Sequence, residues 1–426
     1  MSTPDAGPRQ RLSERFGLLR LRNFRGVFLA QSVSVFGDGI TPVALTLAVL
    51  ELTGSGTDLG LVLAAQALPL AGFALVGGVW ADRLPRVKVM IASDLMRAAV
   101  QATAAFLLLS GAAQIWQLAL LAALHGAAEA FFRPAAGALL PQVVPAEELQ
   151  RANALMGMSD NFGWMVGPAV AGTLVALIGA GGAIAVDAAT FLASALFLVG
   201  VHAPAIARTR AAQTFVAELR DGWREVRSRT WLWAMLLRTC LVLCIVIAPF
   251  QVLGPMGLQE QGHTAAWGWI MGAFSLGMFV GAGVALDYRP QRPMVAVCLL
   301  GTTALAAPLS LALGGGPWVL AVVQAVRGVA VGVLVAVWNT ALQTEIEEEA
   351  LGRVVAWDWM SALALWPVGL ALAGPFAEWF GVTTTAWIMV ALGTVATFWV
   401  LGVRDVWRMR WRVRTPPEAP GPSRAT

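Results

Sequence analysis

The stretch GVWADRLPRVK, residues 78–88, separates two apolar segments that we place at 57–80 and 89–110. Each segment is about as long as the roughly 20-residue helix that crosses a bilayer. Between them stand Asp82, Arg83, Arg86 and Lys88, with Pro85 at the predicted turn. This pattern predicts a pair of membrane helices joined by a short basic loop.

The same alternation of apolar segments and short loops continues in both directions. The chain has 426 residues, of which 58% are apolar and 13% charged. Soluble domains average about 25% charged residues, so the composition excludes a soluble globular protein. We predict an all-α membrane protein with twelve spans, at 24–50, 57–80, 89–110, 114–137, 149–177, 182–202, 231–256, 265–286, 294–313, 317–343, 351–375 and 384–403.

The loops divide into two kinds by charge. Arg or Lys occurs in both tails and in every second loop, at 83–88, 151, 208–229, 289–292 and 353. The alternate loops, such as ELTGSGTD at 51–58 and QEQGHT at 259–264, contain neither. Because cytoplasmic loops carry the Lys and Arg excess, we predict a multi-pass protein of the cell membrane with both termini in the cytoplasm. The net charge of +4 therefore reflects the topology of the protein in the membrane and not nucleic-acid binding.

Short matches about 200 residues apart indicate an internal duplication. GVWAD at 78–82 corresponds to GVALD at 283–287, and His125-Gly126 corresponds to Arg327-Gly328. Paired repeats are typical of transporters. We expect two pseudo-symmetric six-helix bundles, at 24–202 and 230–403, between a cytoplasmic N-terminal tail at 1–23 and a basic C-terminal tail at 404–426.

The predicted cytoplasmic linker, residues 203–229, contains an amphipathic segment. Phe215, Leu219, Trp223 and Val226 recur at helical spacing, and arginines occupy the other side. Such a helix is expected to lie on the anionic inner leaflet, which would make membrane lipids a partner. A solvated linker helix is the alternative.

The loop at 78–88 resembles the signature Gly-x-x-x-Asp-Arg-x-x-Arg-x-Lys/Arg of the major facilitator superfamily. Gly78, Asp82, Arg83 and Arg86 match it, while Pro85 replaces a Gly that is usual there. The resemblance implies the major facilitator fold of two six-helix bundles. It also implies that this loop stabilises the outward-facing state.

A second motif lies in the fifth predicted span. Gly163, Gly167 and Pro168 match the Gly-x-x-x-Gly-Pro-x-x-Gly-Gly motif of the antiporter branch, with Ala171 in place of a Gly. Glycines at i and i+4 permit close helix contact, and a proline bends the helix. Further segments, among them SVFGD at 34–38 and DAATF at 187–191, resemble macrolide-efflux proteins and the enterobactin exporter.

Ionisable residues within predicted spans are the candidates for the functional site, because a charge at the bilayer centre costs about 2.5–3.5 kcal/mol on insertion scales. Asp38 lies near the middle of the first span, between Gly37 and Gly39 and before Pro42. Broken helices at mid-depth form transporter sites. We expect Asp38 to accept a proton or to bind a cationic group. Capping of exposed backbone is the alternative.

His125, Glu129 and Arg133 form one polar stripe on the fourth span, because residues four apart lie on nearly the same face of a helix. A His beside a Glu suits proton coupling. A self-neutralised Glu129–Arg133 pair, with His125 merely hydrogen-bonded, is the alternative. His125 stands roughly where many proton-coupled members of the family have an Arg, which the second half retains as Arg327.

Two arginines are candidates in the second half. Arg327 in the tenth span is expected to hold an anionic group of the substrate or to balance Asp38 across the cavity, and Arg238 in the seventh is a weaker candidate of the same kind. Five further charged residues lie nearer predicted helix ends, where we expect structural pairing or capping: Asp94, Arg97, Asp160, Asp187 and Asp358.

The sequence contains no Gly-x-x-x-x-Gly-Lys-Ser/Thr phosphate loop and no His/Cys cluster at metal-ligand spacing. We therefore predict a protein that is not an enzyme, uses no ATP and needs no metal or cofactor. The predicted function is secondary export of a hydrophobic small molecule by proton antiport, from a monomer. An importer or facilitator, a siderophore exporter, and a non-transporting sensor or lipid-handling protein are the alternatives.

Overall fold

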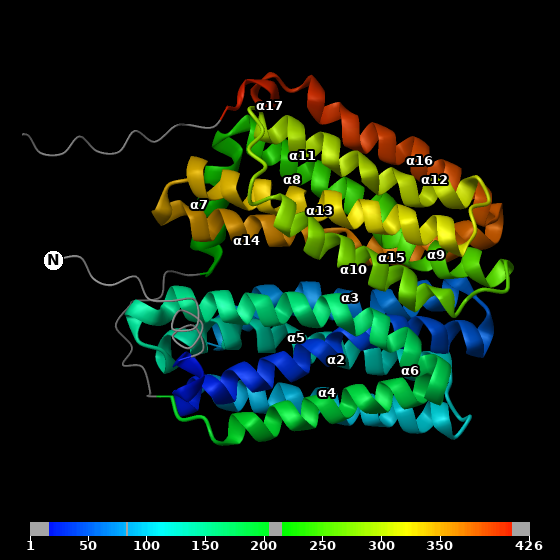
Figure 1. Cartoon of the computed structure of the whole chain (residues 1–426), viewed down its shortest axis with the longest axis horizontal. Helices are drawn as coiled ribbons and strands as arrows, with labels where there is room; N and C mark the ends of the chain where they lie inside the picture. The colour runs from blue at the N-terminus through cyan, green and yellow to red at the C-terminus, as the bar shows by residue number, and fades with distance from the viewer. Residues whose placement is uncertain (1–16, 82–83, 204–214, 411–426) are drawn as a thin grey trace, which may run out of the picture.

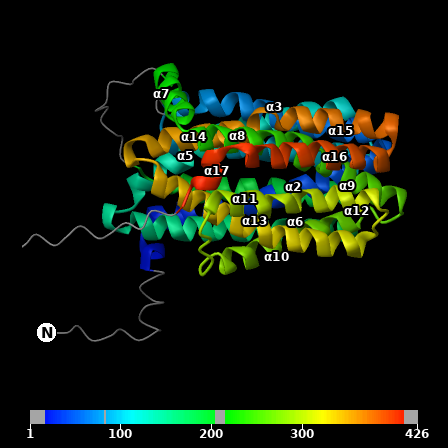
Figure 2. The ribbon, with the colours of Figure 1, turned by 90° about the horizontal axis from the view of Figure 1, so that it is seen from above.

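The computed structural model describes residues 17–81, 84–203 and 215–410. In these ranges the chain forms helices and no strands. A helix satisfies all of its backbone hydrogen bonds internally, which is what a segment in a bilayer requires. Figures 1 and 2 show the long helices running along one axis, and Figure 1 shows them in two layers that correspond to the two halves of the chain.

The first layer is the N bundle. After a 3₁₀ turn at Gly17–Arg20, it comprises α2 (Arg22–Thr53), α3 (Gly56–Ala81), α4 (Arg86–Leu109), α5 (Ile115–Val143) and α6 (Leu149–Val199). The bounds of α2 to α5 contain or nearly match the first four predicted spans. Positive-φ glycines end two of these segments, at Gly54 and Gly111. Glycine suits those turns because it lacks the Cβ that disfavours left-handed backbone.

Helix α6 crosses the bundle twice. Its 51 residues would span about 76 Å as one straight helix, more than twice the roughly 30 Å of a hydrocarbon core. The backbone is non-helical at Gly179 (φ 74°, ψ 168°). Gly167, before the break, packs on Gly39 of α2, and Asp187, after it, lies against neighbouring Gly37. The chain therefore reverses at Gly179, as the predicted division between 149–177 and 182–202 requires.

The second layer is the C bundle, which also contains six crossings in the described residues. Its elements are α8 (Thr230–Val242), a π-helical turn (Leu243–Ile247), α9 (Ala248–Glu260), α10 (Ala266–Val284), α11 (Pro293–Gly301), a 3₁₀ turn (Thr302–Leu305), α12 (Ala306–Ala312), α13 (Pro317–Glu345), α14 (Glu348–Ala364), α15 (Trp366–Phe380), α16 (Val382–Phe398), a 3₁₀ turn (Trp399–Gly402) and α17 (Arg404–Arg408).

Three of the predicted C-bundle spans are interrupted. The span at 231–256 contains the π-turn, the span at 294–313 contains a 3₁₀ turn, and the span at 351–375 breaks at Leu365. Pro367 follows that break directly, and a proline disfavours helical backbone in the residue before it. Gly369 of α15 packs on the carbonyl of Cys244, so the break in the eleventh span lies beside the π-turn of the seventh.

The duplication predicted from sequence has a counterpart in the packing. Gly126 of α5 lies against the carbonyl of Gln66 in α3, and Gly328 of α13 lies against the carbonyl of Phe274 in α10. The same glycine thus lets the fourth span approach the second and the tenth approach the eighth. The two halves repeat one packing arrangement.

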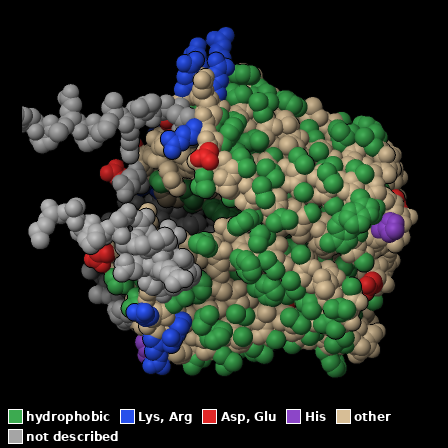
Figure 3. All heavy atoms as spheres, in the orientation of Figure 1, with side chains coloured by type: hydrophobic (Ala, Val, Ile, Leu, Met, Phe, Trp, Pro, Cys, Tyr) green, Lys and Arg blue, Asp and Glu red, His purple; other side chains and the backbone are tan. Residues whose placement is uncertain are grey.

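The outer surface is rich in exposed apolar side chains. Leu286, Trp318, Leu177 and Trp379 each have 75% or more of their surface exposed. Figure 3 shows hydrophobic side chains over most of the visible face, with Lys and Arg gathered toward one end. We call this end, where α4, α6, α11 and α14 begin, the basic end. An apolar outer surface of this extent suits contact with lipid tails.

The linker helix α7 (Phe215–Ser228) lies against the C bundle. The rings of Trp223 and Trp357 of α14 are 4.9 Å apart, and Val226 is fully buried. The C-terminal part of its apolar side therefore contacts protein. The side chains of Phe215 and Leu219 lie outside the described set, and lipid contact of the helix stays a prediction.

Candidate functional site

A cavity of about 1050 Å³ lies between the two bundles. Its walls come from α2, α3, α5 and α6 of the N bundle and from α9, α10, α13 and α15 of the C bundle. Along α10 the lining extends from Trp267 to Ala282, about 22 Å at 1.5 Å per residue. Figure 3 shows the surface hollowed between the bundles toward the basic end.

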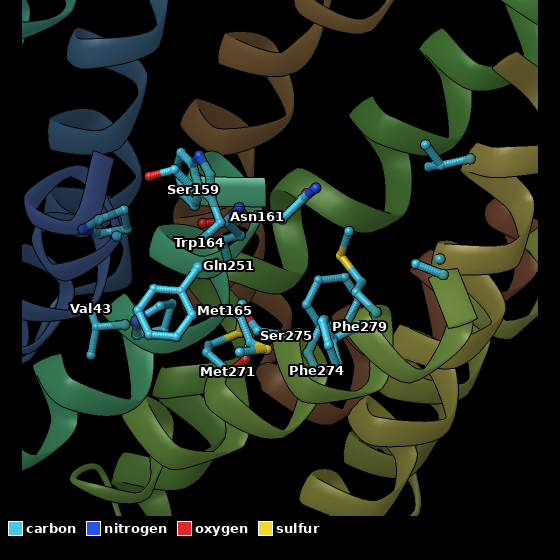
Figure 4. Close-up of a pocket in the computed structure, with 18 of the residues that line it drawn as sticks. Val43, Ser159, Asn161, Trp164, Met165, Gln251, Met271, Phe274, Ser275 and Phe279 are labelled. Carbon is cyan, nitrogen blue, oxygen red and sulfur yellow. The ribbon is translucent and has the colours of Figure 1, made fainter. Parts of the chain in front are cut away.

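Aromatic and sulfur-containing side chains dominate this lining. Figure 4 shows Met271, Phe274 and Phe279 of α10 on one wall, facing Val43 and Trp164 of the N bundle. Trp164 and Trp366, which the sequence places inside spans, both line the cavity. Such side chains accommodate apolar ligands of varied shape, because methionine is flexible and aromatic rings offer large contact areas. The full aromatic and methionine set is Phe28, Phe162, Trp164, Trp267, Phe274, Phe279, Trp366, Met158, Met165, Met271 and Met278.

The polar groups of the lining are few. Gln66, Ser159, Asn161, Gln251 and Ser275 are neutral. The charged lining residues in the described part of the chain are Glu129 and Arg133 of α5. The cavity therefore combines an apolar surface with a small number of hydrogen-bonding groups, as ligand sites for small molecules do.

The end opposite the basic end is closed by contacts between the bundles. Gly172 of α6 packs on Gly268 of α10, and Gly374 of α15 packs on the backbone of Gly56. Pairs of glycines permit this close approach of helices.

A carboxylate completes this closure. Glu378 of α15 accepts hydrogen bonds from the hydroxyls of Ser55 and Thr57, both at 2.7 Å, and from the backbone N–H of Thr57 at 3.0 Å. It thereby satisfies a free N–H at the start of α3, which belongs to the other bundle. Glu378 is exposed, and its pairing joins residues more than 300 positions apart.

A buried polar network occupies the interior of the N bundle. At its centre Arg97 of α4 is fully buried, with its guanidinium between the rings of Phe132 and Phe191, at 4.5 and 4.2 Å from their centroids. Arg97 pairs closely with Asp94, one turn away, and Ser194 donates to the other oxygen of Asp94 at 2.6 Å. Helices α4, α5 and α6 are thus tied together at this arginine.

Asp38 joins this network from α2. One oxygen of its carboxylate lies 3.4 Å from Nη1 of Arg97, and its side chain is 13% exposed. Its neighbour Gly39 lines the cavity. Pro42, four residues on, has no N–H to donate to the carbonyl of Asp38, so the helix has an open backbone acceptor here. Asp38 therefore lies against a buried cation and next in sequence to a residue of the cavity wall.

The predicted stripe on α5 divides in the structure. Glu129 and Arg133 line the cavity and form an ion pair at 2.7 Å, supported by a hydrogen bond from Nε at 3.0 Å. His125 is 3% exposed and lies edge-on to Phe191, with ring centroids 5.6 Å apart. Its Nδ1 has no hydrogen-bond partner among the described residues. The pair matches the self-neutralised alternative, and His125 belongs to the apolar side of the network.

The two C-bundle arginines lie behind the cavity wall, outside its lining. Arg327 donates to Gln324 at 2.9 Å and lies 4.7 Å from the ring centroid of Phe274, whose side chain does line the cavity. Arg238 reaches the backbone carbonyls of Thr397 and Cys298, both at 3.4 Å. Within the described ranges, neither forms an ion pair with an acidic residue.

The structure describes the two family motifs, the loop at 78–88 and the Gly/Pro motif at 163–172, to different extents. Asp82 and Arg83 lie outside the described residues, and Gly78 lies in α3. Arg86 donates to the carbonyl of Ala138 in α5 at 2.5 Å, which links helices of the same bundle. Gly163 packs on the backbone at Val35, and Gly167 packs on Gly39 with Pro168 beside it, so this motif supports the stretch of α2 that carries Asp38.

Sequence reasoning missed the part that Asp94, Arg97 and Asp187 play, because each was assigned to structural pairing near a helix end. A signal for them exists. Three spans carry polar residues at spacings of three and four, which place them on one helix face. These stripes are Ser34, Asp38 and Thr41 in α2, Asp94, Arg97 and Gln101 in α4, and Asp187, Thr190 and Ser194 in α6.

A metal site is not part of this arrangement. Over the ranges that the structure describes, no group of three or more His, Cys, Asp or Glu side chains could hold a metal ion. The candidate site thus consists of an apolar cavity between two bundles and a buried acid–base network along one side of it. This architecture defines a class of protein, the multi-pass membrane transporter with a central cavity.

Comparison with known proteins identifies the family to which this chain belongs. The sequence profile of the Major Facilitator Superfamily matches residues 27–358. The multidrug efflux pump Tap of Mycolicibacterium fortuitum is 31% identical over 391 residues, which cover 85% of this chain and 92% of that protein. Macrolide efflux protein A of Streptococcus pyogenes is 25% identical over 397 residues, covering 89% and 96%. The chain belongs to the Major Facilitator Superfamily, and its relatives include drug efflux pumps.

Solved structures support the fold. The nucleoside transporter NupG superposes with a TM-score of 0.72 at 13% identity, over 89% of this chain and 98% of that one. A bacterial homolog of the lysosomal transporter Spinster, in an inward-facing and unoccupied conformation, gives 0.68 at 15%, over 96% and 100%. The predicted all-α major facilitator fold is confirmed.

Proposed function

We propose that the protein exports a bulky, largely apolar small molecule across the cell membrane in exchange for protons. The observation that carries this proposal is the cavity of about 1050 Å³, which is lined mainly by aromatic, methionine and aliphatic side chains. The relatives named for multidrug and macrolide efflux support export of such molecules. The substrate classes in those names, multiple drugs and macrolides, are the candidates for this chain.

The orientation follows from the loops. Because Lys and Arg concentrate in cytoplasmic loops, we place the basic end and both termini in the cytoplasm. The cavity then opens inward, and the contact of Glu378 with Ser55 and Thr57 closes the outer side. Alternating access would rock the N bundle against the C bundle so that the inner end closes and this outer contact opens. A monomer contains both bundles and the whole cavity.

Asp38 is the proposed proton acceptor. Its side chain contacts Arg97, it shares this guanidinium with Asp94, and its neighbour Gly39 lines the cavity. A proton on Asp38 would cancel its charge and weaken its attraction to Arg97, which then remains with Asp94. Substrate in the cavity and a proton on Asp38 would thus act on the same part of α2, which is the coupling that antiport requires.

The driving force suffices for export. One proton moving inward across 100 mV releases about 2.3 kcal/mol. Each pH unit across the membrane adds about 1.4 kcal/mol. Because 1.4 kcal/mol corresponds to a tenfold concentration ratio, a neutral substrate can be concentrated tenfold or more outside the cell.

The test is the variant Asp38→Asn in inverted membrane vesicles, with erythromycin and ethidium as probes. We expect wild-type vesicles to accumulate a probe when a proton gradient is imposed, and the variant to lose the pH dependence while it still inserts at normal abundance. Coupled accumulation retained in Asp38→Asn would place the proton site elsewhere.

Two alternatives are separated by the same vesicles. A facilitator would move the probe only down its concentration gradient, and an importer would move it out of the inverted vesicles. Neither would require protons. A non-transporting sensor or lipid-handling protein would leave accumulation and cellular drug tolerance unchanged on deletion. Including an iron-free siderophore among the probes tests the siderophore exporter.

A further inference from the structure

Asp187, in the returning half of α6, is a fully buried carboxyl to which the function above gives no part. Its Oδ2 accepts hydrogen bonds from the hydroxyl of Thr41 at 2.5 Å and from the amide of Gln101 at 2.6 Å. Among the described residues no Lys or Arg forms an ion pair with it. A buried carboxylate without a cation is costly, and such a group takes up a proton instead.

The hydrogen atoms around Asp187 can be counted. Gln101 Nε2 lies 2.6 Å from Asp187 Oδ2 and 2.7 Å from Thr41 Oγ1, and because these two oxygens are 2.5 Å apart they share one of its hydrogens. Thr41 accepts from Gln101 and so gives its single hydroxyl hydrogen to Asp187. Oδ2 is therefore supplied with two donors, as an acceptor should be.

The other oxygen has the opposite surroundings. Thr190 donates its one hydroxyl hydrogen to the backbone carbonyl of Asp187 at 2.7 Å, and its oxygen lies 3.3 Å from Oδ1. Because a hydroxyl has one hydrogen and the carbonyl is the nearer acceptor, Oδ1 receives at most a long hydrogen bond from Thr190. A hydrogen on Oδ1 completes this contact. On the remaining side the backbone of Gly37 lies so close that a Cβ there would overlap Oδ1 of Asp187 and Oγ1 of Thr190.

The charged neighbours do not supply a cation to Asp187. Across from it, α2 contributes Asp38, α4 contributes Asp94 and Arg97, and α5 contributes His125 and Glu129. Arg97 is held by the carboxylates of Asp94 and Asp38 and by two aromatic rings, and Glu129 is paired with Arg133. Asp38, Asp94 and Asp187 thus lie around one guanidinium that pairs with the first two, which leaves Asp187 without a cation of its own.

We propose that Asp187 is a second proton-binding site of the transporter, protonated in this conformation on Oδ1 and connected to the cavity through Thr41. Thr41 lies between Gly39 and Pro42, both of which line the cavity. For release, the carboxyl of Asp187 turns its hydrogen toward Thr41, whose oxygen accepts it while the hydroxyl hydrogen of Thr41 passes to a water molecule of the cavity. This leaves a carboxylate and an intact threonine, with no change of oxidation state. The coupling part of this proposal rests on the proton antiport proposed above.

The protonation is tested without a substrate. Purified protein in lipid nanodiscs is titrated with pH while its infrared spectrum is recorded, for wild type, Asp187→Asn and the control Asp160→Asn. Asp160 is a half-buried acid of the same bundle whose carboxylate accepts from Gln31 at 3.1 Å. We expect a protonated-carboxyl band at neutral pH that persists in Asp160→Asn and is missing in Asp187→Asn. An unchanged band in Asp187→Asn overturns the proposal.

Transport tests the coupling. In the Asp187→Asn protein the amide can keep the bonds to Thr41 and Gln101 and donate to Thr190, so the bundle should fold. We expect proteoliposomes to show one fewer proton exchanged per erythromycin than wild type. A structural role would leave this ratio unchanged, which overturns the proposal.

The path through Thr41 has a matched pair of variants. Thr41→Val removes the hydroxyl with little change of shape and should slow proton release from Asp187 at least tenfold, whereas Thr41→Ser should retain it. Equal rates in the two variants contradict the path. If wild-type protein exchanges no protons for erythromycin, the proposed antiport fails, while the infrared titration still decides whether Asp187 holds a proton.

Discussion

The two bundles repeat one helical arrangement and treat buried charge differently. In the N bundle, Arg97 connects Asp94 and Asp38, with Asp187 nearby on its hydroxyl and amide donors. In the C bundle, Arg238 and Arg327 lie apart from each other and donate to backbone carbonyls or to an amide. The two halves share the glycines at which helices pack, Gly126 and Gly328, but differ in their buried charged residues.

This difference assigns different tasks to the two halves. A connected set of acids around one cation can gain or lose a proton with a small rearrangement, because the hydrogen bonds are already present. A solitary arginine stays charged and offers no partner that changes state. The proton chemistry is therefore expected in the N bundle, whereas the C bundle supplies the aromatic and methionine wall of α10.

The largest effect should follow from Arg97→Met. Removing this cation leaves buried acids without a partner, and breaking a buried ion pair costs about 3–5 kcal/mol. We expect poor folding or a strongly lowered melting temperature in detergent, measured by scanning fluorimetry and size-exclusion chromatography. The control Arg151→Met removes a half-exposed pair with Glu148 at 3.0 Å and should cost less than about 1 kcal/mol. Equal stability of the two variants would contradict the central position of Arg97.

A smaller effect is expected from Arg327→Gln. The variant loses the contact with the ring of Phe274, about 1 kcal/mol, and the hydrogen bond to Gln324, about 1 kcal/mol. Because no acidic residue in the described part of the chain pairs with Arg327, the pH profile of erythromycin transport should keep its shape while the rate falls. A shifted pH profile would mean that the C bundle takes part in proton binding.

The smallest effect is expected from Arg238→Met. The bonds of Arg238 to the carbonyls of Thr397 and Cys298 are long, and a buried charge without an acid carries a desolvation cost. Stability should stay the same or rise by about 1 kcal/mol, as seen in the same melting assay. A loss as large as that of Arg97→Met would remove the contrast between the bundles.

Much of the fold could be predicted from the sequence, because bilayer thickness sets span length and loop charges mark alternate ends. The reversal within α6 was predictable from GAGG at 179–182, where Gly179 adopts positive φ. The break at Leu365 was not predicted, since a long apolar segment continues through Trp366 and Pro367. Apolar length alone does not distinguish a continuous helix from two shorter ones.

The site was predictable only in part. Asp38, Glu129 and Arg133 were identified because an isolated charge in a span is conspicuous. Asp187 was assigned to a helix end, since distance along the sequence gave its depth and not its neighbours. Its position depends on how α6 folds back beside α2, where Gly37 leaves room for its carboxyl. Such contacts between distant segments are set by tertiary packing.

The carboxylate of Glu378 on Ser55 and Thr57 has a consequence for the energetics of the whole cycle. An exposed contact of this kind contributes about 1 kcal/mol or less. That is below the roughly 2.3 kcal/mol that a membrane potential of 100 mV supplies per charge. The share of this contact in the resting bias toward one side is thus comparable with thermal fluctuation, so the ion gradient is large enough to open it. We expect turnover to respond to substitutions at this contact that leave ligand affinity intact.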